Sequence, residues 1–252
     1  MPNPSRFYLS HMYAKTKYRA TWDPTKQLKI GYIGKLEQGV ISIYSSLDKE
    51  GIPLELSTNV SPAAMDYSSH DSVVISTKLS GMAPGAGSML TTADAGFSLA
   101  FNSAESIVFQ AAGYRVHQLL NLAAIEDAVL RKYREGNWDR DWVIITELVE
   151  AEQATIIISN STDGTLELKA HAAADLDKLS LTDAALDLSV VRERGSSLKY
   201  IAQHGLTPLY RVMGIQHPFL GGISLSSRRM PAASAAAAER LMILDFDERE
   251  LE

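Results

Sequence analysis

The sequence predicts an α+β fold, a twisted and mostly antiparallel sheet with flanking helices. Three observations support this prediction. Several segments alternate apolar and polar residues with a period of two, as strands with one buried face do. Glycines and an Asp-Gly pair separate these segments at hairpin spacing. Residues 115–135 instead repeat their apolar residues at spacings of three and four, which is typical of an amphipathic helix.

A first hairpin is expected over Asp71–Phe109. Residues 71–80 and residues 95–101 both alternate, and the loop Gly81–Asp94 joins them. The apolar face of the two strands is expected to consist of Val73, Ile75, Thr77, Leu79, Phe97, Leu99 and Phe101.

The longest helix is expected over Arg115–Glu135. Three basic residues in its last turn complement the helix dipole, and Gly136 stands where a C-cap belongs. The apolar stripe of this helix consists of Leu119, Leu122, Ile125, Val129 and Tyr133.

A second hairpin is expected over Trp142–Ala173. β-Branched residues dominate residues 142–159, the segment Asn160–Gly164 ends in Asp-Gly, and residues 165–172 alternate strictly. A further strand is expected within Lys178–Val191.

The chain changes character after Leu220. The segment Gly221–Ser234 is rich in Gly, Ser and Pro and contains Arg228-Arg229, which predicts a linker with a trypsin-like cleavage site. We expect a short helix over Ala235–Leu244, followed by an acidic end. The tail gathers the apolar residues Leu241, Met242, Ile243, Leu244 and Phe246.

Length and composition are those of a globular protein. The 252 residues suffice for one large domain or two small ones, and 46% hydrophobic with 21% charged residues argues against bulk disorder. The net charge of −6 lacks the basic excess usual in nucleic-acid-binding proteins, so no nucleic-acid partner is expected.

The chain contains no cysteine, which excludes disulfides, thiolate nucleophiles and cysteine-based metal sites. Its start, Met-Pro-Asn-Pro-Ser-Arg, lacks the apolar core of a signal peptide, and no run of about 18 apolar residues predicts a transmembrane helix. We therefore expect a cytoplasmic protein that enters a membrane, if at all, by strands or an amphipathic face.

No motif for catalysis, metal binding or a cofactor is found. The six histidines have no metal-ligand spacing, and no Gly-x-Ser-x-Gly motif is present. The glycine-rich residues 81–88 lack the lysine of a phosphate-binding loop. Glu147, Glu150 and Glu152 are expected to be ordinary sheet-surface residues. We expect a protein that is not an enzyme and has no cofactor.

The order of these elements resembles the pore-forming domain of the gasdermin family. That domain has an alternating hairpin, an amphipathic helix, a long strand leading into a second hairpin, a last strand and a helical end. Here Asp-Trp-Val-Ile-Ile-Thr-Glu-Leu-Val-Glu, residues 141–150, looks like the family's strand entering the second hairpin. The resemblance covers residues 10–220 and implies a gasdermin N-terminal-domain-like fold.

The resemblance implies an autoinhibited pore-forming protein. In gasdermins, proteolysis removes a C-terminal inhibitory part, and the two hairpins then extend and assemble into a membrane β-barrel that kills the cell. The short tail here resembles bacterial members, which act in antiphage defence. The lipidated cysteine of many bacterial members has no counterpart in this chain.

The resemblance also assigns regions and partners. It implies a pore-forming domain over residues 1–220, a linker over 221–234 and an inhibitory tail over 235–252. The partners are an activating protease, membrane lipids and, in the pore, further copies of a chain that is monomeric at rest. The location is cytoplasmic at rest and the inner (plasma) membrane once activated.

The residues expected to act in the membrane follow from the same resemblance. The basic N-terminal stretch is expected to contact lipid headgroups through Arg6, Lys15, Lys17 and Arg19. The lipid-facing residues of the two hairpins are expected to be Val73, Ile75, Leu79, Phe97, Leu99, Phe101, Ile156, Ile158, Leu166 and Leu168. The tail residues that inhibit are expected to be Leu241, Met242, Ile243, Leu244 and Phe246.

Two other functions fit the same sequence. One is a non-enzymatic binding or scaffold protein that keeps its hairpins folded and its tail attached. The other is an enzyme whose site is built from scattered residues. Leakage from liposomes after limited proteolysis separates the first of these from a pore-forming protein.

Overall fold

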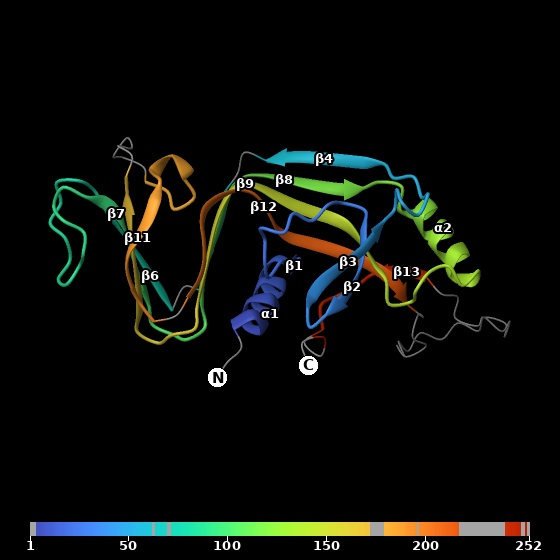
Figure 1. Ribbon diagram of the computed structural model, residues 1–252, viewed down its shortest axis with the longest axis horizontal. Coiled ribbons are helices and arrows are strands. Elements are labelled where there is room, and N and C mark those ends of the chain that lie inside the picture. The colour runs from blue at the N-terminus through green and yellow to red at the C-terminus, as the bar shows by residue number, and fades with distance from the viewer. Residues whose placement is uncertain are drawn as a thin grey trace, which may run out of the picture. The chain divides into compact units, whose positions relative to one another are not determined.

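A computed structural model describes residues 4–61, 64–69, 72–171, 179–195, 197–216, 240–247 and 250 (Figure 1). Antiparallel strands dominate it, and two α-helices accompany them, so the predicted α+β class with a mostly antiparallel sheet is confirmed. The residues fall into two compact units. One consists of Met1–Gln27, Thr58–Val116 and Val149–Leu209, and the other of Leu28–Ser57, His117–Leu148 and Tyr210–Glu252.

Three long strands contribute residues to both units. They are β8 (Ser106–Leu119), β9 (Val143–Ser159) and β12 (Ser197–Gln216). In β9, β-branched residues form about half of the strand, and most of its residues are buried, as in a strand covered on both faces. β4 (Leu56–Ser61) pairs with β8.

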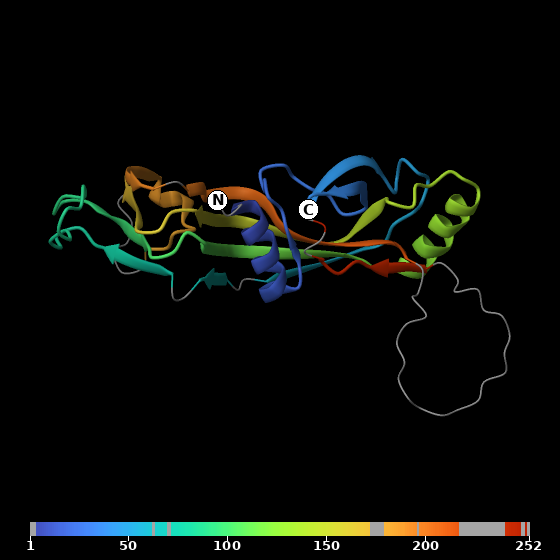
Figure 2. The same ribbon diagram turned by 90° about the horizontal axis from the view of Figure 1, so that it is seen from below.

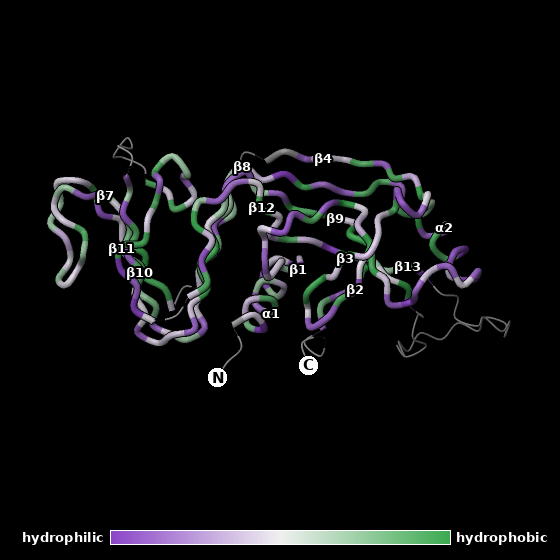
Figure 3. Tube along the Cα trace, in the orientation of Figure 1, coloured by the Kyte–Doolittle hydropathy of each residue, from purple (hydrophilic) through white to green (hydrophobic). Residues whose placement is uncertain are grey.

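The first unit contains a four-stranded antiparallel sheet in the order β11-β10-β7-β6. Its strands are β6 (Val73–Lys78), β7 (Ala95–Phe101), β10 (Gly164–Ala170) and β11 (Leu188–Arg194), and η1 (Ala184–Leu186) precedes β11. Hydropathy changes repeatedly along these strands (Figure 3), which is the alternation that the sequence predicts.

The first unit also contains the N-terminal helix. α1 (Pro4–Thr16) buries Tyr8, Leu9 and Met12 and lies against β1 (Arg19–Ala20). β5 (Met65–Ser68) pairs antiparallel with β8. The helix was not predicted, because aromatic and basic residues alternate along it without an apolar stripe.

The second unit packs a helix against strands. β2 (Tyr32–Glu37) forms a hairpin with β3 (Val40–Ser46) and pairs with β9 through Ile33 and Ile144. Gln38 and Gly39, both with positive φ, form the turn between β2 and β3. α2 (Leu122–Arg134) lies beside β13 (Arg240–Ile243) (Figures 1 and 2).

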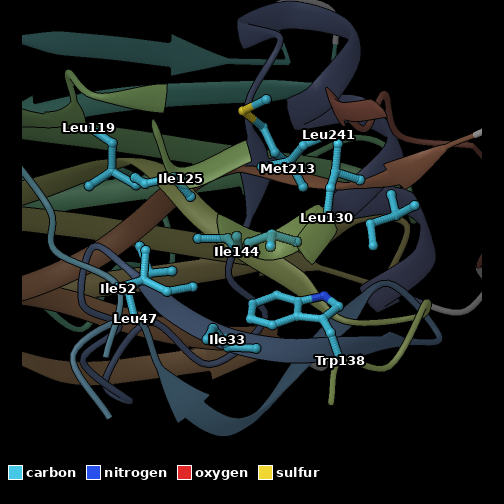
Figure 4. Close-up of a cluster of buried hydrophobic side chains, with 12 residues drawn as sticks. Ile33, Leu47, Ile52, Leu119, Ile125, Leu130, Trp138, Ile144, Met213 and Leu241 are labelled. Carbon is cyan, nitrogen blue, oxygen red and sulfur yellow. The ribbon is translucent and has the colours of Figure 1, made fainter. Parts of the chain in front are cut away.

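One apolar core holds the second unit together (Figure 4). It joins α2, β2, β9, the end of β12 and the C-terminal strand β13. The buried members are Ile33, Leu47, Ile52, Leu119, Ile125, Val129, Leu130, Trp138, Ile144, Met213, Ile215 and Leu241.

The predicted helix over Arg115–Glu135 begins too early. Residues up to Leu119 belong to β8, and the helix runs over Leu122–Arg134. Before it, the Asn121 side chain accepts a hydrogen bond from Glu55 N at 2.9 Å and donates one to the Pro53 carbonyl at 3.0 Å. These contacts fix the chain between strand and helix. Of the predicted stripe, Ile125 and Val129 are buried within α2.

Candidate functional site: the hairpin sheet and the C-terminal strand

The apolar residues predicted for the first hairpin stand in register across the four-stranded sheet. β6 and β7 pair as the expected hairpin, with Ile75 opposite Leu99, and β7 and β10 pair with Leu99 opposite Leu166. Residues directly opposite one another in antiparallel strands share a face. The face contains Val73, Ile75, Phe97, Leu99, Phe101, Leu166 and Leu168.

This apolar face forms one core of the first unit. Leu99, Leu166 and Leu168 are fully buried, and the remaining members of the face belong to or pack against the same cluster. Ile157 of β9 and Leu181 lie against them. Leu79 follows the end of β6 and is half-buried. Seven of the ten residues predicted to face lipid thus help to hold this unit folded.

The predicted second hairpin is wrong in its pairing. β10 pairs with β7 on one side and β11 on the other, whereas β9 belongs to the other sheet. The apolar residues of β10 lie opposite the apolar residues of β7. Gly96 of β7 lies so close to the Leu168 carbonyl that any side chain at position 96 would clash with it. Ile156 and Ile158 are buried, but Ile157 between them is the residue of β9 that joins the cluster.

The opposite face of this sheet is polar and partly covered. The loop between β6 and β7 lines a partly open cavity of about 260 Å³ against it. Lys78 and Glu167, both nearly buried, line this cavity together with Ser76 and Ser98. One face of the sheet is therefore apolar and the other polar, although β6 and β7 have only 6 and 7 residues.

The C-terminal tail forms a strand, not the predicted helix, over its described residues. β13 pairs antiparallel with β12, Ile215 opposite Leu241 and Gly214 opposite Met242. An available sheet edge supplies hydrogen-bond partners that outweigh the helical preference of these residues. Leu244 N continues the contact by donating to the Val212 carbonyl at 3.0 Å.

The apolar tail residues have different environments. Leu241 is 4% exposed and lies near Leu130 and Met213 in the core (Figure 4), whereas Met242 and Ile243 are exposed. Leu244 packs against a second cluster that includes Val143 and Val212, and Phe246 is half-buried.

Glu126 of α2 fastens the start of the strand. Its Oε1 accepts a hydrogen bond from Leu241 N at 3.1 Å and lies 3.7 Å from Arg240 Nε. The tail is thus held by a strand pairing, a buried side chain and a charged contact.

The predicted linker Gly221–Ser234 lies outside the described residues, as do Arg228 and Arg229. Of the predicted lipid contacts, Arg6, Lys15 and Lys17 are exposed on or just after α1. Arg19 is 2% exposed in β1, so its prediction as a surface contact is wrong for this folded chain. The short strand places Arg19 in the interior beside Ala20, which is also buried.

His11 links α1 to β5. Its Nε2 hydrogen-bonds with the Tyr67 hydroxyl, and the two rings lie 5.4 Å apart. Burial, and secondly Lys15, lower the pKa of His11 below its ordinary value of 6.5, while Glu105 acts in the opposite direction. Neutral His11 is thus favoured in the folded chain.

This shift predicts a pH dependence of stability. Because the unfolded chain binds the His11 proton more readily, the free energy of unfolding should fall as pH decreases from about 6.5 through the folded pKa, and should not change through His11 above pH 6.5. Urea unfolding at pH 7.5 and pH 5.5 measures this. His11→Gln should reduce the difference between the two pH values, and an unchanged difference would contradict the assignment.

No cluster of three or more His, Asp or Glu side chains suited to a metal occurs in the part of the chain that the structure describes. None of the described helices combines the length and the apolar character needed to cross a membrane.

No protein-family model matches the chain, and no curated protein matches it. Among solved structures it is similar to the cryo-EM structure of the Gasdermin A3 membrane pore, with a TM-score of 0.34 and 9% sequence identity. The similarity covers 87% of this chain and 92% of that one.

Proposed function

We propose that this chain is a gasdermin-like pore-forming protein of the bacterial type. In this proposal, residues 1–220 form the pore, and the tail over 235–252 keeps the chain inactive until a protease cuts the linker over 221–234. The cut protein then assembles with further copies in the inner membrane and kills the cell, as part of antiphage defence. The resting chain is a cytoplasmic monomer and not an enzyme.

The observation that supports this most is the division of the four-stranded sheet into two faces. Ile75, Leu99 and Leu166 line up on the apolar face, whereas Ser76, Ser98 and Glu167 line up on the polar face. A membrane barrel needs this arrangement, with one face toward lipid and the other toward water. Closing the barrel then gives every strand edge a hydrogen-bond partner in lipid.

The C-terminal strand supports an inhibitory role for the tail. β13 occupies the edge of β12 from Met213 to Gln216 and buries Leu241 in the core. Its loss would leave backbone groups of β12 and an apolar surface open to another copy of the chain. The tail is held by only four paired residues and one buried leucine. Once a protease has cut the linker, the tail is no longer tethered and can dissociate from β12.

Lipid attraction is assigned to the exposed cations near the N-terminus. Arg6 and Lys15 of α1, with Lys17 after it, present positive charge to solvent. Each such charge adds about 1 kcal/mol near an anionic lipid surface. They would favour the first encounter with the inner membrane.

Leakage from vesicles tests this function. A site for a sequence-specific protease is placed within residues 221–234, and the protein is added to dye-filled vesicles of anionic and neutral lipids. The uncut protein should release no dye, whereas the cut protein should release it from anionic vesicles and form rings visible by electron microscopy. Cut protein that stays folded and monomeric without release would instead favour the scaffold function.

A further inference from the structure

The loop Gly81–Asp94, between β6 and β7, is held against the polar face by strands outside its own hairpin. Glu167 Oε2 of β10 accepts a hydrogen bond from Met89 N at 2.8 Å. The Arg192 guanidinium of β11 donates to the Gly87 carbonyl. Glu167 and Arg192 are opposite one another in the β10–β11 pair, so both side chains reach the loop from one place on the sheet.

The end of the loop is held by a second set of charges. Lys169 Nζ lies 2.7 Å from Asp94 Oδ1, and Lys78 Nζ donates to the Asp94 carbonyl at 2.6 Å. Asp94 Oδ2 accepts hydrogen bonds from Thr91 N at 2.7 Å and from Thr91 Oγ1 at 2.8 Å. The hydrogen bond from Lys169, followed by those from Thr91, holds the pKa of Asp94 well below its usual range.

The position of Glu167 makes its contact informative. The residue is 4% exposed, and a carboxylate so placed is costly unless it is paired or hydrogen-bonded. Its hydrogen bond with Met89 N therefore fixes the middle of the loop, and Leu90 next to it is buried. The side chains of Met82 and Met89, in contrast, are exposed.

The folded loop limits the length of both strands. β6 ends at Lys78 after 6 residues, and β7 begins at Ala95 and has 7. A strand that crosses a membrane needs about 9–11 residues. In a hairpin that crosses a membrane, the loop would have to leave Glu167, Lys169 and Arg192 before its residues could lengthen both strands at this end.

We propose that Glu167, Lys169 and Arg192 form a clamp on the loop, and that opening this clamp is a separate step that limits the rate of hairpin extension after the tail has left. The second part rests on the proposed pore function. The clamp residues lie on the polar face, so once the loop has left they would face the water-filled interior of the barrel. The same charges thus hold the resting loop and suit the open pore.

The first test measures the clamp in the uncut protein. Hydrogen exchange is followed on peptides covering residues 82–94 in the original chain, in Glu167→Gln and in Arg192→Ala. Glu167→Gln keeps the shape of the side chain and weakens the charge-assisted bond, and Arg192 is only half-buried, so both proteins should fold. Exchange in this loop should rise at least tenfold in each variant.

Glu193→Gln is the matched control. Glu193 lies beside Arg192 in β11, but its carboxylate contacts Lys199 at 2.5 Å and Ser197 rather than the loop. Exchange of the loop should stay unchanged in this variant. Equal exchange of the loop in Glu167→Gln, Arg192→Ala and the original chain would overturn the clamp.

The second test measures the rate of dye release after cutting. Both clamp variants should release dye several times faster than the cut original chain, while their uncut forms stay silent because the tail is still attached. Faster exchange with an unchanged release rate would overturn the rate-limiting step. If no cut protein releases dye, the proposed function fails, while the exchange contrast with Glu193→Gln still establishes the clamp.

Discussion

Ile75→Lys is expected to abolish dye release by the cut protein, whereas Val74→Lys, one residue away, is expected to leave it nearly unchanged. Ile75 belongs to the apolar face of β6, opposite Leu99, and Val74 points to the other face. A lysine on the lipid-facing side of a barrel costs about 2–4 kcal/mol at the bilayer centre, and a ring repeats that cost in every subunit. A lysine facing the water-filled interior meets no such cost.

The resting structure makes these two positions a suitable pair. Val74 is 53% exposed, and Ile75 is half-buried at the side of its cluster, so neither lysine would be enclosed in the folded chain. Leu168→Lys would be a poor test, because Leu168 is fully buried at rest and a charge there would unfold the first unit. Thermal unfolding of both variants before cutting provides the check on folding.

Comparing dye release by Ile75→Lys and Val74→Lys shows which face of β6 meets lipid. Loss of release in Ile75→Lys alone supports the assignment of the two faces. Release at the original rate by a folded and cut Ile75→Lys protein would contradict it. Loss in both variants would show that β6 tolerates no charge on either face, which a barrel with a water-filled interior does not predict.

The sequence was sufficient to predict the hairpin β6–β7 and the apolar face of β10. In these strands, residues such as Phe97, Leu99, Leu166 and Leu168 alternate with small or polar ones over a full strand length. The alternation also determines which residues of each strand share a face of the sheet. The alternation did not reveal that β10 pairs with β7 instead of β9. That choice of partner depends on which strands come together in the folded chain and on the close approach of Gly96 to the Leu168 carbonyl.

The strands β12 and β13 were not predicted, because tertiary contacts rather than local sequence determine them. β12 is the longest strand, yet Gly205, Pro208 and Gly214 interrupt its pattern and favour turns in the sequence. The tail residues Leu241–Leu244 suit a helix by composition, but the edge of β12 and the carboxylate of Glu126 provide partners for a strand. No local pattern encodes a partner strand that lies more than 20 residues away.

A reversible lock on the tail tests whether the pairing of β13 with β12 keeps the chain inactive. Gln216 and Arg240 are opposite one another, and both are exposed. Opposite residues in antiparallel strands have Cα atoms about 4.5–5.5 Å apart, within the range that a disulfide spans. Because the chain has no cysteine, Gln216→Cys/Arg240→Cys introduces the only thiols.

The disulfide keeps the tail on its strand after the linker is cut. A bond at the first residue of β13 holds the tail at a high effective concentration over the edge of β12. The single variants Gln216→Cys and Arg240→Cys cannot form this bond within one chain, so both should release dye when oxidised and cut. Arg240→Cys also lacks the contact with Glu126, so its rate is the reference for the reduced double variant. Mass spectrometry before each assay reports whether the bond has formed and whether the linker is cut.

The decisive measurement is dye release from anionic vesicles by the oxidised, fully cut double variant, before and after a reductant is added. No release is expected before reduction, and after reduction the double variant should release dye at the rate of the cut Arg240→Cys protein. Equal release before and after reduction, with the disulfide intact in the first sample, would contradict the claim that the bound tail strand holds the protein inactive.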